Sequence, residues 1–230
     1  MSTRPTVFAT FALLGTLYAA QGLPFGFFSQ ALPVFLRKQG YSLEAVGLSS
    51  LLAAPWAFKF LWAPLVDRRG SARFGRRRAW IIPLQLLSAL LLLGLGWFPR
   101  QGPLTWLLVA VFFTNLFAAT QDIATDALAL DVLPPAQRGL ANGIQVAGYR
   151  VGMILGGGLV LLVFERVGWT ASFVGMGLTM LFLSVPIWLF RETEAPARAA
   201  KPSESMLAAH FLRRADALPI LALARVVQVW

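Results

Sequence analysis

The sequence of 230 residues contains no cysteine and one histidine, His210. Without cysteine there can be no disulfide, no thiolate metal site and no cysteine nucleophile. The chain also lacks the HExxH pattern of zinc hydrolases and the GxSxG turn of serine hydrolases. We therefore expect no metal, no cofactor and no enzyme activity, and we interpret His210 as a solvated side chain in a linker.

Charged residues are scarce as well, at 13% of the sequence, while 57% of the residues are hydrophobic. Soluble domains are about 25% charged and about 45–50% apolar, so this composition predicts a membrane protein rather than a soluble or disordered one. Acidic residues number 10 against 20 basic ones, a net charge of +10. The basic residues are separated by long apolar runs and lack interleaved aromatic residues. We therefore expect anionic lipid headgroups, and not nucleic acid, as their partner.

Long apolar stretches are abundant. A bilayer core of roughly 30 Å requires about 20 apolar residues per helix. Six stretches meet this requirement, and they run from Pro5 to Leu36, Leu43 to Val66, Ala79 to Phe98, Leu104 to Leu130, Gly139 to Phe164 and Thr170 to Phe190. The first is about twice as long as the apolar part of a signal peptide, which argues against that interpretation. The predicted fold class is an all-α membrane protein with six transmembrane helices.

Beyond the sixth stretch the composition changes. Residues 191–217 are rich in alanine, proline, serine and charge, which predicts a cytoplasmic linker. A seventh apolar stretch from Leu218 to Trp230 would form only about 20 Å of helix, too short to cross a bilayer. We therefore expect a six-helix membrane half-domain (1–190), a linker (191–217) and the start of a truncated seventh helix (218–230).

The distribution of basic residues orients the predicted helices. With a cytoplasmic N-terminus, thirteen basic residues lie on the cytoplasmic side, namely Arg4, Arg68, Arg69, Arg73, Arg76, Arg77, Arg78, Arg138, Arg191, Arg198, Lys201, Arg213 and Arg214. The opposite side holds four, namely Arg37, Lys38, Arg100 and Arg166. Since cytoplasmic loops carry the excess of positive charge, the count predicts a cytoplasmic N-terminus.

Four charged residues fall inside complete predicted spans, namely Lys59, Asp122, Asp126 and Arg150. Such groups are costly in hydrocarbon and mark a solute pathway or a buried pair. Asp122 and Asp126 are four residues apart and share a helix face. Counted from the turn near residues 135–136, Asp122 and Arg150 lie at similar depth. This predicts an ion pair between them, with Lys59 as a competitor for the same carboxylates.

A structural network of charges and a direct role in transport are both compatible with this pattern. Asp122 and Asp126 are the candidates for proton coupling, and the candidates for polar residues of a cavity are Gln21, Gln30, Asn115, Gln121 and Gln145. In the fifth stretch, Gly148, Gly152 and Gly156 are spaced by four, which predicts close packing against a neighbouring helix.

The segment that joins the second and third stretches reads DRRGSARFGRRR, from Asp67 to Arg78. It resembles the loop between helices two and three of the major facilitator superfamily. The family pattern begins with glycine four residues before the aspartate, where this chain has Ala63, and residues 71–74 lengthen the loop. The residues that carry the resemblance are Asp67, Arg68, Gly70, Gly75, Arg76, Arg77 and Arg78.

Three longer strings narrow the resemblance, and they are FKFLWAPLVDR (58–68), FGRRRAW (74–80) and TQDIATDALALDVLPPAQRGLANGIQVAGYRVGM (120–153). Together they are similar to the AmpG-related permeases over about residues 8–192. The resemblance implies the N-terminal half of a twelve-helix carrier that imports a bulky polar solute, such as a muropeptide, across the bacterial inner membrane by alternating access. The lysine and aspartate that this family carries early in helix seven have no counterpart in ALARVVQVW (222–230).

The partners implied by the resemblance are membrane lipid, a small solute and protons, and the full-length carrier is expected to be a monomer. Asp122 or Asp126 would bind the proton, and Lys59 and Arg150 would serve as counter-charges or as contacts for an anionic solute. Two alternatives stay open at this point. One is a siderophore permease of the same branch, and the other is a membrane receptor or assembly subunit that transports nothing.

Overall fold

The described part of the chain is built from helices. The computed structural model describes residues 6–71, 74–97 and 104–192. The α-helices in these ranges are α1 (Val7–Gly26), α2 (Leu32–Lys38), α3 (Leu43–Ser49), α4 (Ala54–Phe58), α5 (Ala63–Arg68), α6 (Arg78–Trp97), α7 (Leu104–Val132), α8 (Arg138–Met153) and α9 (Val160–Leu189). They are supplemented by the π-helical turns η1 (Phe27–Ala31) and η5 (Ile154–Leu159) and by the 3₁₀ turns η2 (Ser50–Ala53), η3 (Lys59–Leu61) and η4 (Pro135–Gln137).

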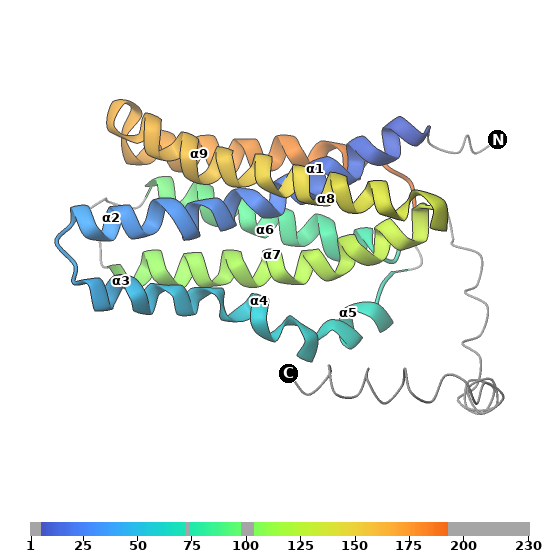
Figure 1. The fold of residues 1–230 in the computed structure, drawn as a ribbon, viewed down its shortest axis with the longest axis horizontal. Helices are drawn as coiled ribbons and strands as arrows, with labels where there is room; N and C mark the ends of the chain where they lie inside the picture. Colours follow the sequence, from blue (N-terminus) through green and yellow to red (C-terminus); the bar gives the residue numbers. More distant parts are fainter. Residues whose placement is uncertain (1–5, 72–73, 98–103, 193–230) are drawn as a thin grey trace, which may run out of the picture. The chain divides into compact units, whose positions relative to one another are not determined.

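Four helical stretches in the described ranges are long and apolar enough to cross a membrane. They are Val7–Lys38, Arg78–Trp97, Leu104–Val132 and Pro135–Leu189. These stretches confirm the predicted class of an all-α membrane protein, and the chain passes back and forth along the bundle (Figure 1). The number of six spans stays a prediction. The predicted linker from residue 193 onward and the predicted seventh helix lie outside the described residues.

The second predicted span, from Leu43 to Val66, is not one continuous helix. It is divided into α3, α4 and α5 by the turns η2 and η3. Pro55 and Pro64 each stand in the first turn of the helix that follows a break. Proline has no backbone N–H and collides with the preceding turn, so it interrupts a helix but is tolerated at a helix start. The breaks therefore follow from the two prolines.

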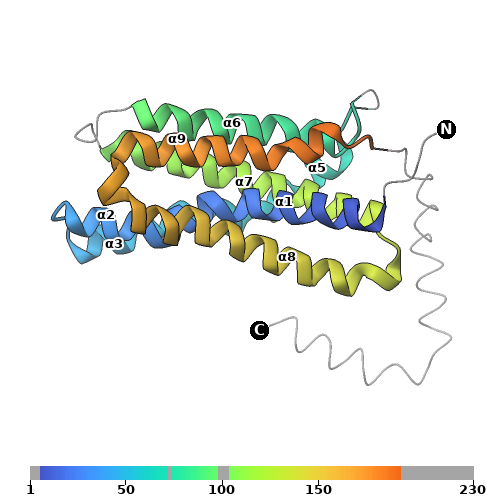
Figure 2. The same ribbon diagram turned by 90° about the horizontal axis from the view of Figure 1, so that it is seen from above.

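The predicted fifth and sixth spans are separated by a sharp bend within α9. Gly168 has a φ of 77°, a left-handed conformation that interrupts the helical geometry of α9 at this residue. Glycine adopts this conformation without steric cost because it has no Cβ. The chain folds back at the bend, so the two parts of α9 run in opposite directions (Figure 2).

Helices α1 and α8 pack closely through glycine residues on both sides, which confirms the predicted role of the glycine stripe. A Cβ added at Gly148 would lie 2.7 Å from the carbonyl oxygen of Gly15. A Cβ added at Gly152 would collide with the backbone of Ala19 and Leu23. With only hydrogen atoms at these positions, the two backbones approach more closely than larger side chains would allow.

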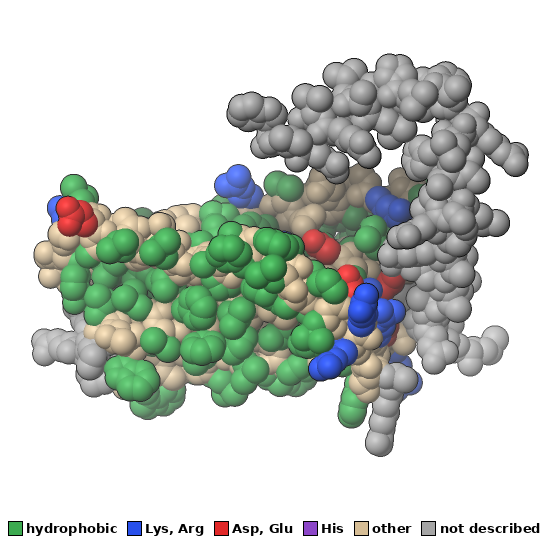
Figure 3. Space-filling model, turned by 90° about the horizontal axis from the view of Figure 1, so that it is seen from below, with side chains coloured by type: hydrophobic (Ala, Val, Ile, Leu, Met, Phe, Trp, Pro, Cys, Tyr) green, Lys and Arg blue, Asp and Glu red, His purple; other side chains and the backbone are tan. Residues whose placement is uncertain are grey.

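The exterior of this bundle is apolar in its middle. Figure 3 shows hydrophobic side chains over most of the middle of one face, with charged side chains at its two ends and along its upper edge. Exposed large apolar residues include Leu48, Leu51, Phe58, Phe60 and Leu61 of the second predicted span. An exposed apolar surface of this extent is typical of a protein in contact with lipid or with another helical domain.

The glycine contact between α1 and α8 yields a testable prediction for stability. Gly152→Ala places a methyl group against the backbone of α1, and overpacking of this kind costs about 1–3 kcal/mol. Gly143 lies on the same helix, with no atom within 4 Å of an added Cβ. Gly143→Ala is therefore the matched control, and its higher helix propensity should leave stability unchanged or raised by about 0.5–1 kcal/mol. Thermal unfolding in detergent, followed by circular dichroism, measures both. Equal midpoints for the two variants would contradict the close contact.

Candidate functional site

Helix α7 carries a row of buried polar side chains through the middle of the bundle. The row consists of Asn115, Thr120, Gln121, Asp122 and Thr125, all of which are buried. A polar group in an apolar interior is costly unless it finds a hydrogen-bond partner. The partners from other parts of the chain are supplied by two segments, namely α1 and the broken second span. The polar row thus determines which segments surround α7.

The strongest of these interactions is an ion pair between Lys59 of η3 and Asp122 of α7. The Asp122 side chain is only 8% exposed, whereas the Lys59 side chain is 35% exposed. The carboxylate is therefore enclosed by protein, whereas part of the Lys59 side chain is exposed. An ammonium group has three donors, so Lys59 can hold Asp122 and still bind a second anion.

Two tryptophans attach the broken second span to the same helix. The indole N–H of Trp56 donates to the side-chain oxygen of Asn115 at 3.1 Å. The indole N–H of Trp62 donates to the hydroxyl of Thr120 at 3.1 Å. Together with Lys59, these side chains are spaced by three residues, which is the period of the 3₁₀ turn between them. The break in this span therefore aligns its three polar side chains with α7.

Helix α1 contributes one amide side chain and one backbone carbonyl to the contacts of this row. Gln21 is fully buried and donates to the hydroxyl of Thr125 at 3.1 Å. Gln121 donates to the backbone carbonyl of Leu17 at 3.4 Å. The side-chain oxygen of Gln21 is buried and has no hydrogen-bond partner among the described residues. Gln21, Gln121 and Asn115 thus lie between helices, where their amide groups hold the bundle together.

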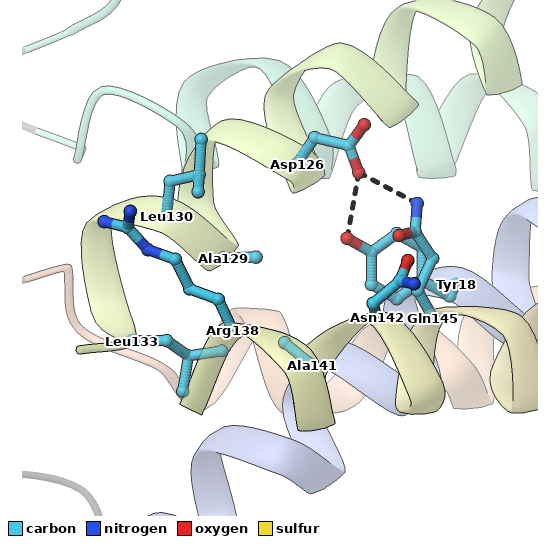
Figure 4. A pocket seen from close by; sticks show the side chains of 9 residues that line it. All are labelled: Tyr18, Asp126, Ala129, Leu130, Leu133, Arg138, Ala141, Asn142 and Gln145. Carbon is cyan, nitrogen blue, oxygen red and sulfur yellow. Dashed lines mark hydrogen bonds between the residues drawn. The ribbon is translucent and has the colours of Figure 1, made fainter. Parts of the chain in front are cut away.

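Asp126 lies one turn further along α7, in a cavity between α1, α7 and α8 of about 190 Å³. It accepts a hydrogen bond from the Tyr18 hydroxyl at 2.9 Å and one from the Gln145 amide at 3.2 Å. Figure 4 shows both donors directed at the carboxylate, while Arg138 extends from the start of α8 toward Leu130. Asp126 is therefore a carboxylate held by neutral donors at the wall of a cavity.

The predicted ion pair between Asp122 and Arg150 is wrong, because Asp122 pairs with Lys59. Arg150 is exposed and makes no ion pair with any described residue. Depth in the bundle does not decide which cation pairs with Asp122. The rotation of α8 about its own axis decides it. Gly148 and Gly152 face α1, and this rotation directs Gln145, not Arg150, toward α7.

The last of the predicted cavity residues, Gln30, lies on η1 and is half-buried. Its side-chain oxygen covers Gly157 of η5, where an added Cβ would lie 2.6 Å from it. Gln30 therefore packs against the π-helical turn of the neighbouring segment. Among the described residues, no group of three or more acidic, histidine or cysteine side chains is arranged to hold a metal ion.

The loop between α5 and α6 is organised by Arg77. Its side chain is only 4% exposed and pairs with Asp67 at 2.9 Å and with Asp131, at the end of α7, at 3.2 Å. A guanidinium group can bind two carboxylates at once because its five N–H donors have a fixed planar arrangement. Arg77 thus links the ends of the second predicted span and α7 to the start of α6.

Glu192, which follows α9, completes this arrangement. Its carboxylate accepts hydrogen bonds from the backbone N–H groups of Arg77 and Arg78 at 3.0 and 3.2 Å. The side chain of Arg78 donates to the carbonyls of Ile187 and Trp188 at 3.1 and 3.0 Å. A carboxylate at a helix N-terminus satisfies free N–H groups and the positive end of the helix dipole. The start of α6 and the end of α9 are therefore held together.

The remaining motif residues support the turn or face solvent. Arg76 donates to the backbone carbonyl of Asp67. Gly75 has a φ of 91°, which favours glycine, and an added Cβ there would collide with Glu192. Gly70 packs against Arg76, and Arg68 is exposed.

The sequence patterns did not point to Tyr18, Trp56, Trp62, Thr120 or Glu192. Tyr18 and Trp56 donate hydrogen bonds to Asp126 and Asn115, which the patterns did identify, whereas Trp62 donates to Thr120. The three-residue spacing of Trp56, Lys59 and Trp62 is a signal that could have identified the contacts of both tryptophans. Glu192 carries no such signal, because its partners are backbone groups distant in sequence.

The Arg77 network predicts a difference between two basic residues of the same loop. Arg77→Ala leaves Asp67 and Asp131 without their shared cation, and we expect a loss of about 2–3 kcal/mol of stability. Breaking a fully buried pair costs about 3–5 kcal/mol, and the loss here is smaller because both carboxylates are partly exposed. Arg68 is exposed, so Arg68→Ala is the control, with the same loss of one positive charge from the loop. Thermal unfolding in detergent compares the two. If the Arg68 variant were destabilised as much as the Arg77 variant, the network would have no structural role.

The chain is similar to known proteins over most of its length. Residues 14–230 match the family model described as Major Facilitator Superfamily. An anhydromuropeptide permease of Escherichia coli strain K12 is 33% identical over 210 residues, which are 91% of this chain and 41% of the relative. An uncharacterised protein of Haemophilus influenzae is 35% identical over 160 residues, 70% of this chain and 38% of that protein. An uncharacterised membrane protein of Saccharomyces cerevisiae is 33% identical over 171 residues, 63% of this chain and 30% of that protein. The chain thus spans about two fifths or less of the length of these relatives.

Proposed function

The chain belongs to the Major Facilitator Superfamily, and on this premise we propose that it forms the N-terminal half of a secondary active permease. In this proposal the complete carrier has twelve helices and imports a bulky polar solute by alternating access. The family and the named relative point to a transporter rather than an enzyme. The chain is a multi-pass membrane protein, and we propose the bacterial inner membrane as its location and a monomer as its active form.

The ion pair between Lys59 and Asp122 is the observation that carries the proposal. Charges inside a bilayer are expensive, so they persist where a transport cycle uses them or where they form a structural pair. The pair here is asymmetric, with an enclosed carboxylate and a partly exposed lysine side chain. An anionic solute that reaches Lys59 competes with Asp122 for its charge. Binding of a proton to Asp122 releases Lys59 for the solute. Proton binding and solute binding would thereby be coupled.

Asp126 is the second carboxylate in the proposed coupling. Its partners, Tyr18 and Gln145, are neutral donors, so no cation compensates its charge through a direct contact among the described residues. It borders a cavity that a water molecule can enter, which gives a proton a route to the carboxylate. We propose that Asp126 exchanges protons with water at the end of the bundle that carries the Arg77 loop. We propose further that Asp122 binds or releases its proton when the solute reaches Lys59.

The relative named as an anhydromuropeptide permease suggests the solute class. A muropeptide is a large polar anion, and the partly exposed Lys59 together with the exposed Arg150 offers positive charge for it. We therefore propose an anhydromuropeptide, or a solute of similar charge and size, as the cargo.

Uptake measurements test the proposed coupling. We expect Asp122→Asn and Asp126→Asn in the full-length protein to reduce proton-driven uptake of a labelled anhydromuropeptide into proteoliposomes to below about a tenth of wild type, because an amide cannot carry the proton. Glu44 is exposed in the first turn of α3, so Glu44→Gln is the control with the same loss of a carboxylate. Wild-type uptake in both aspartate variants would remove the carboxylates from the mechanism. Absence of uptake by the wild-type protein would contradict the permease itself.

Labelling of introduced cysteines tests the proposed orientation, since the chain has no cysteine of its own. Gln39 and Ala136 are the positions to change, because Gln39 lies after α2, Ala136 lies before α8, and both are exposed. With a cytoplasmic N-terminus, a membrane-impermeant maleimide labels Gln39→Cys in intact spheroplasts, and it labels Ala136→Cys only after lysis. The reverse pattern would overturn the orientation that the basic residues predict.

A further inference from the structure

Three aromatic rings from three segments meet beside Lys59, and the mechanism proposed above makes no use of them. The rings are Phe25 of α1, Trp56 of α4 and Tyr149 of α8. Their centroids are 5.8 Å apart for Phe25 and Trp56, 5.6 Å for Phe25 and Tyr149, and 6.1 Å for Trp56 and Tyr149. We call this group the aromatic triad. Each ring contacts the other two, so the triad is one continuous apolar surface.

The three rings of the triad differ in their exposure from the most buried rings of the described residues. Phe27, for example, contacts Phe35 and Phe173, and all three of these rings are at least 94% buried. All three residues of the triad are only half-buried. Phe25 is the single half-buried residue between Gln21 and Phe28, where every neighbour is buried. The triad therefore keeps part of its ring surface open.

The surroundings of the triad fix the rings and leave polar groups free at its border. The indole N–H of Trp56 is held by Asn115 at 3.1 Å, so the plane of this ring is set. The ammonium group of Lys59 lies 5.6 Å from the centre of the same ring, within the range of a cation–π interaction. The hydroxyl of Tyr149 makes no hydrogen bond with any other described residue, and Arg150, next in sequence, is exposed. Positive charge and a free hydroxyl therefore border an apolar surface.

This combination matches the chemistry of a sugar ring that carries a carboxylate. The face of an aromatic ring is electron-rich and attracts the partly positive C–H groups on the face of a pyranose. The ammonium group of Lys59 can bind the carboxylate while it stays paired with Asp122. The Tyr149 hydroxyl can donate to or accept from a ring substituent. A plain carboxylate would use only the lysine, and a neutral sugar would use only the rings.

We propose that the aromatic triad and Lys59 form a subsite that binds a pyranose ring through the rings and an attached carboxylate through the ammonium group. The proposal rests on the proposed permease function and specifies the chemical class of the group that this half of the carrier recognises, namely a pyranose that bears a free carboxylate.

Two sugars that differ by one carboxylate are suitable probes. N-acetylmuramic acid is N-acetylglucosamine with an added lactyl carboxylate, so the pair separates the contribution of the ring from that of the charge. Titration of the full-length protein in nanodiscs, followed by saturation-transfer NMR, reports both the dissociation constant and which sugar protons touch the protein. We expect transfer to the ring protons of both sugars. We expect N-acetylmuramic acid to bind about tenfold more tightly, because its carboxylate forms a charge-assisted hydrogen bond.

Variants divide the subsite into its two parts. Phe25→Leu should weaken N-acetylmuramic acid about fivefold, the value of one aromatic contact, and Phe25→Tyr should retain the affinity. Phe113 is a partly exposed ring of α7 outside the triad, so Phe113→Leu is the matched control and should bind as wild type. Lys59→Gln should abolish the preference for the charged sugar while leaving transfer to the ring protons. Should Phe25→Leu fail to fold, Tyr149→Leu takes its place.

The outcomes distinguish this subsite from the permease function. Equal affinities for Phe25→Leu, Phe113→Leu and wild type would overturn the subsite, and so would a preference for the charged sugar that survives Lys59→Gln. Either result is compatible with normal uptake of anhydromuropeptide, in which case the permease function stands without the subsite. A wild-type protein that binds both sugars as expected but shows no uptake would keep the subsite and contradict the permease.

Discussion

The cost of a charge in hydrocarbon is the constraint on which the middle of this bundle depends. Asp122 is enclosed by protein, and an isolated carboxylate there would cost several kcal/mol. Lys59 removes that cost only if the second predicted span lies against α7 at the right depth. The 3₁₀ turn η3 and the breaks beside it achieve this, because they bring Trp56, Lys59 and Trp62 onto the same side of the span. Side chains three residues apart align in a 3₁₀ turn, which has 3.0 residues per turn. In a regular α-helix, with 3.6 residues per turn, the same side chains would point in different directions.

The structure places two ionic networks at two depths, and they differ in how they can respond to a ligand. Arg77 is enclosed and bound by two carboxylates, while its backbone is held by Glu192. Lys59 has one carboxylate partner and a partly exposed side chain. An enclosed cation that is bound by two carboxylates can be displaced only when the surrounding helices separate. A cation with free donors can exchange partners without such a movement. The Arg77 network is therefore suited to holding helix ends together, and the Lys59 pair is suited to ligand exchange.

Sequence patterns predicted how far along its helix each charged residue lies. They said much less about the direction in which each one points around the helix axis. The stripe of Gly148, Gly152 and Gly156 correctly indicated a close helix contact, because glycine spaced by four has few other uses in an apolar helix. The depth of Asp122 was sufficient to expect a cation beside it. The choice between Lys59 and Arg150 was not predictable from depth, since it depends on which face of α8 packs against α1. That face is set by contacts with Ala19 and Leu23, which are distant in sequence from both charges.

The same contact between α1 and α8 also determines whether the aromatic triad can exist. A Cβ added at Gly22 would collide with the backbone carbonyl of Tyr149, and one added at Gly26 would collide with the backbone of Met153. Phe25 lies between these two glycines in sequence, so the closeness of the backbones brings its ring to 5.6 Å from that of Tyr149. Larger residues at either glycine would push the helices apart and weaken this ring contact, since such rings interact at centroid distances of about 4.5–7 Å. The glycines that pack the bundle and the rings that border Lys59 are therefore parts of one arrangement, in which the distance between two backbones fixes the geometry of the proposed subsite.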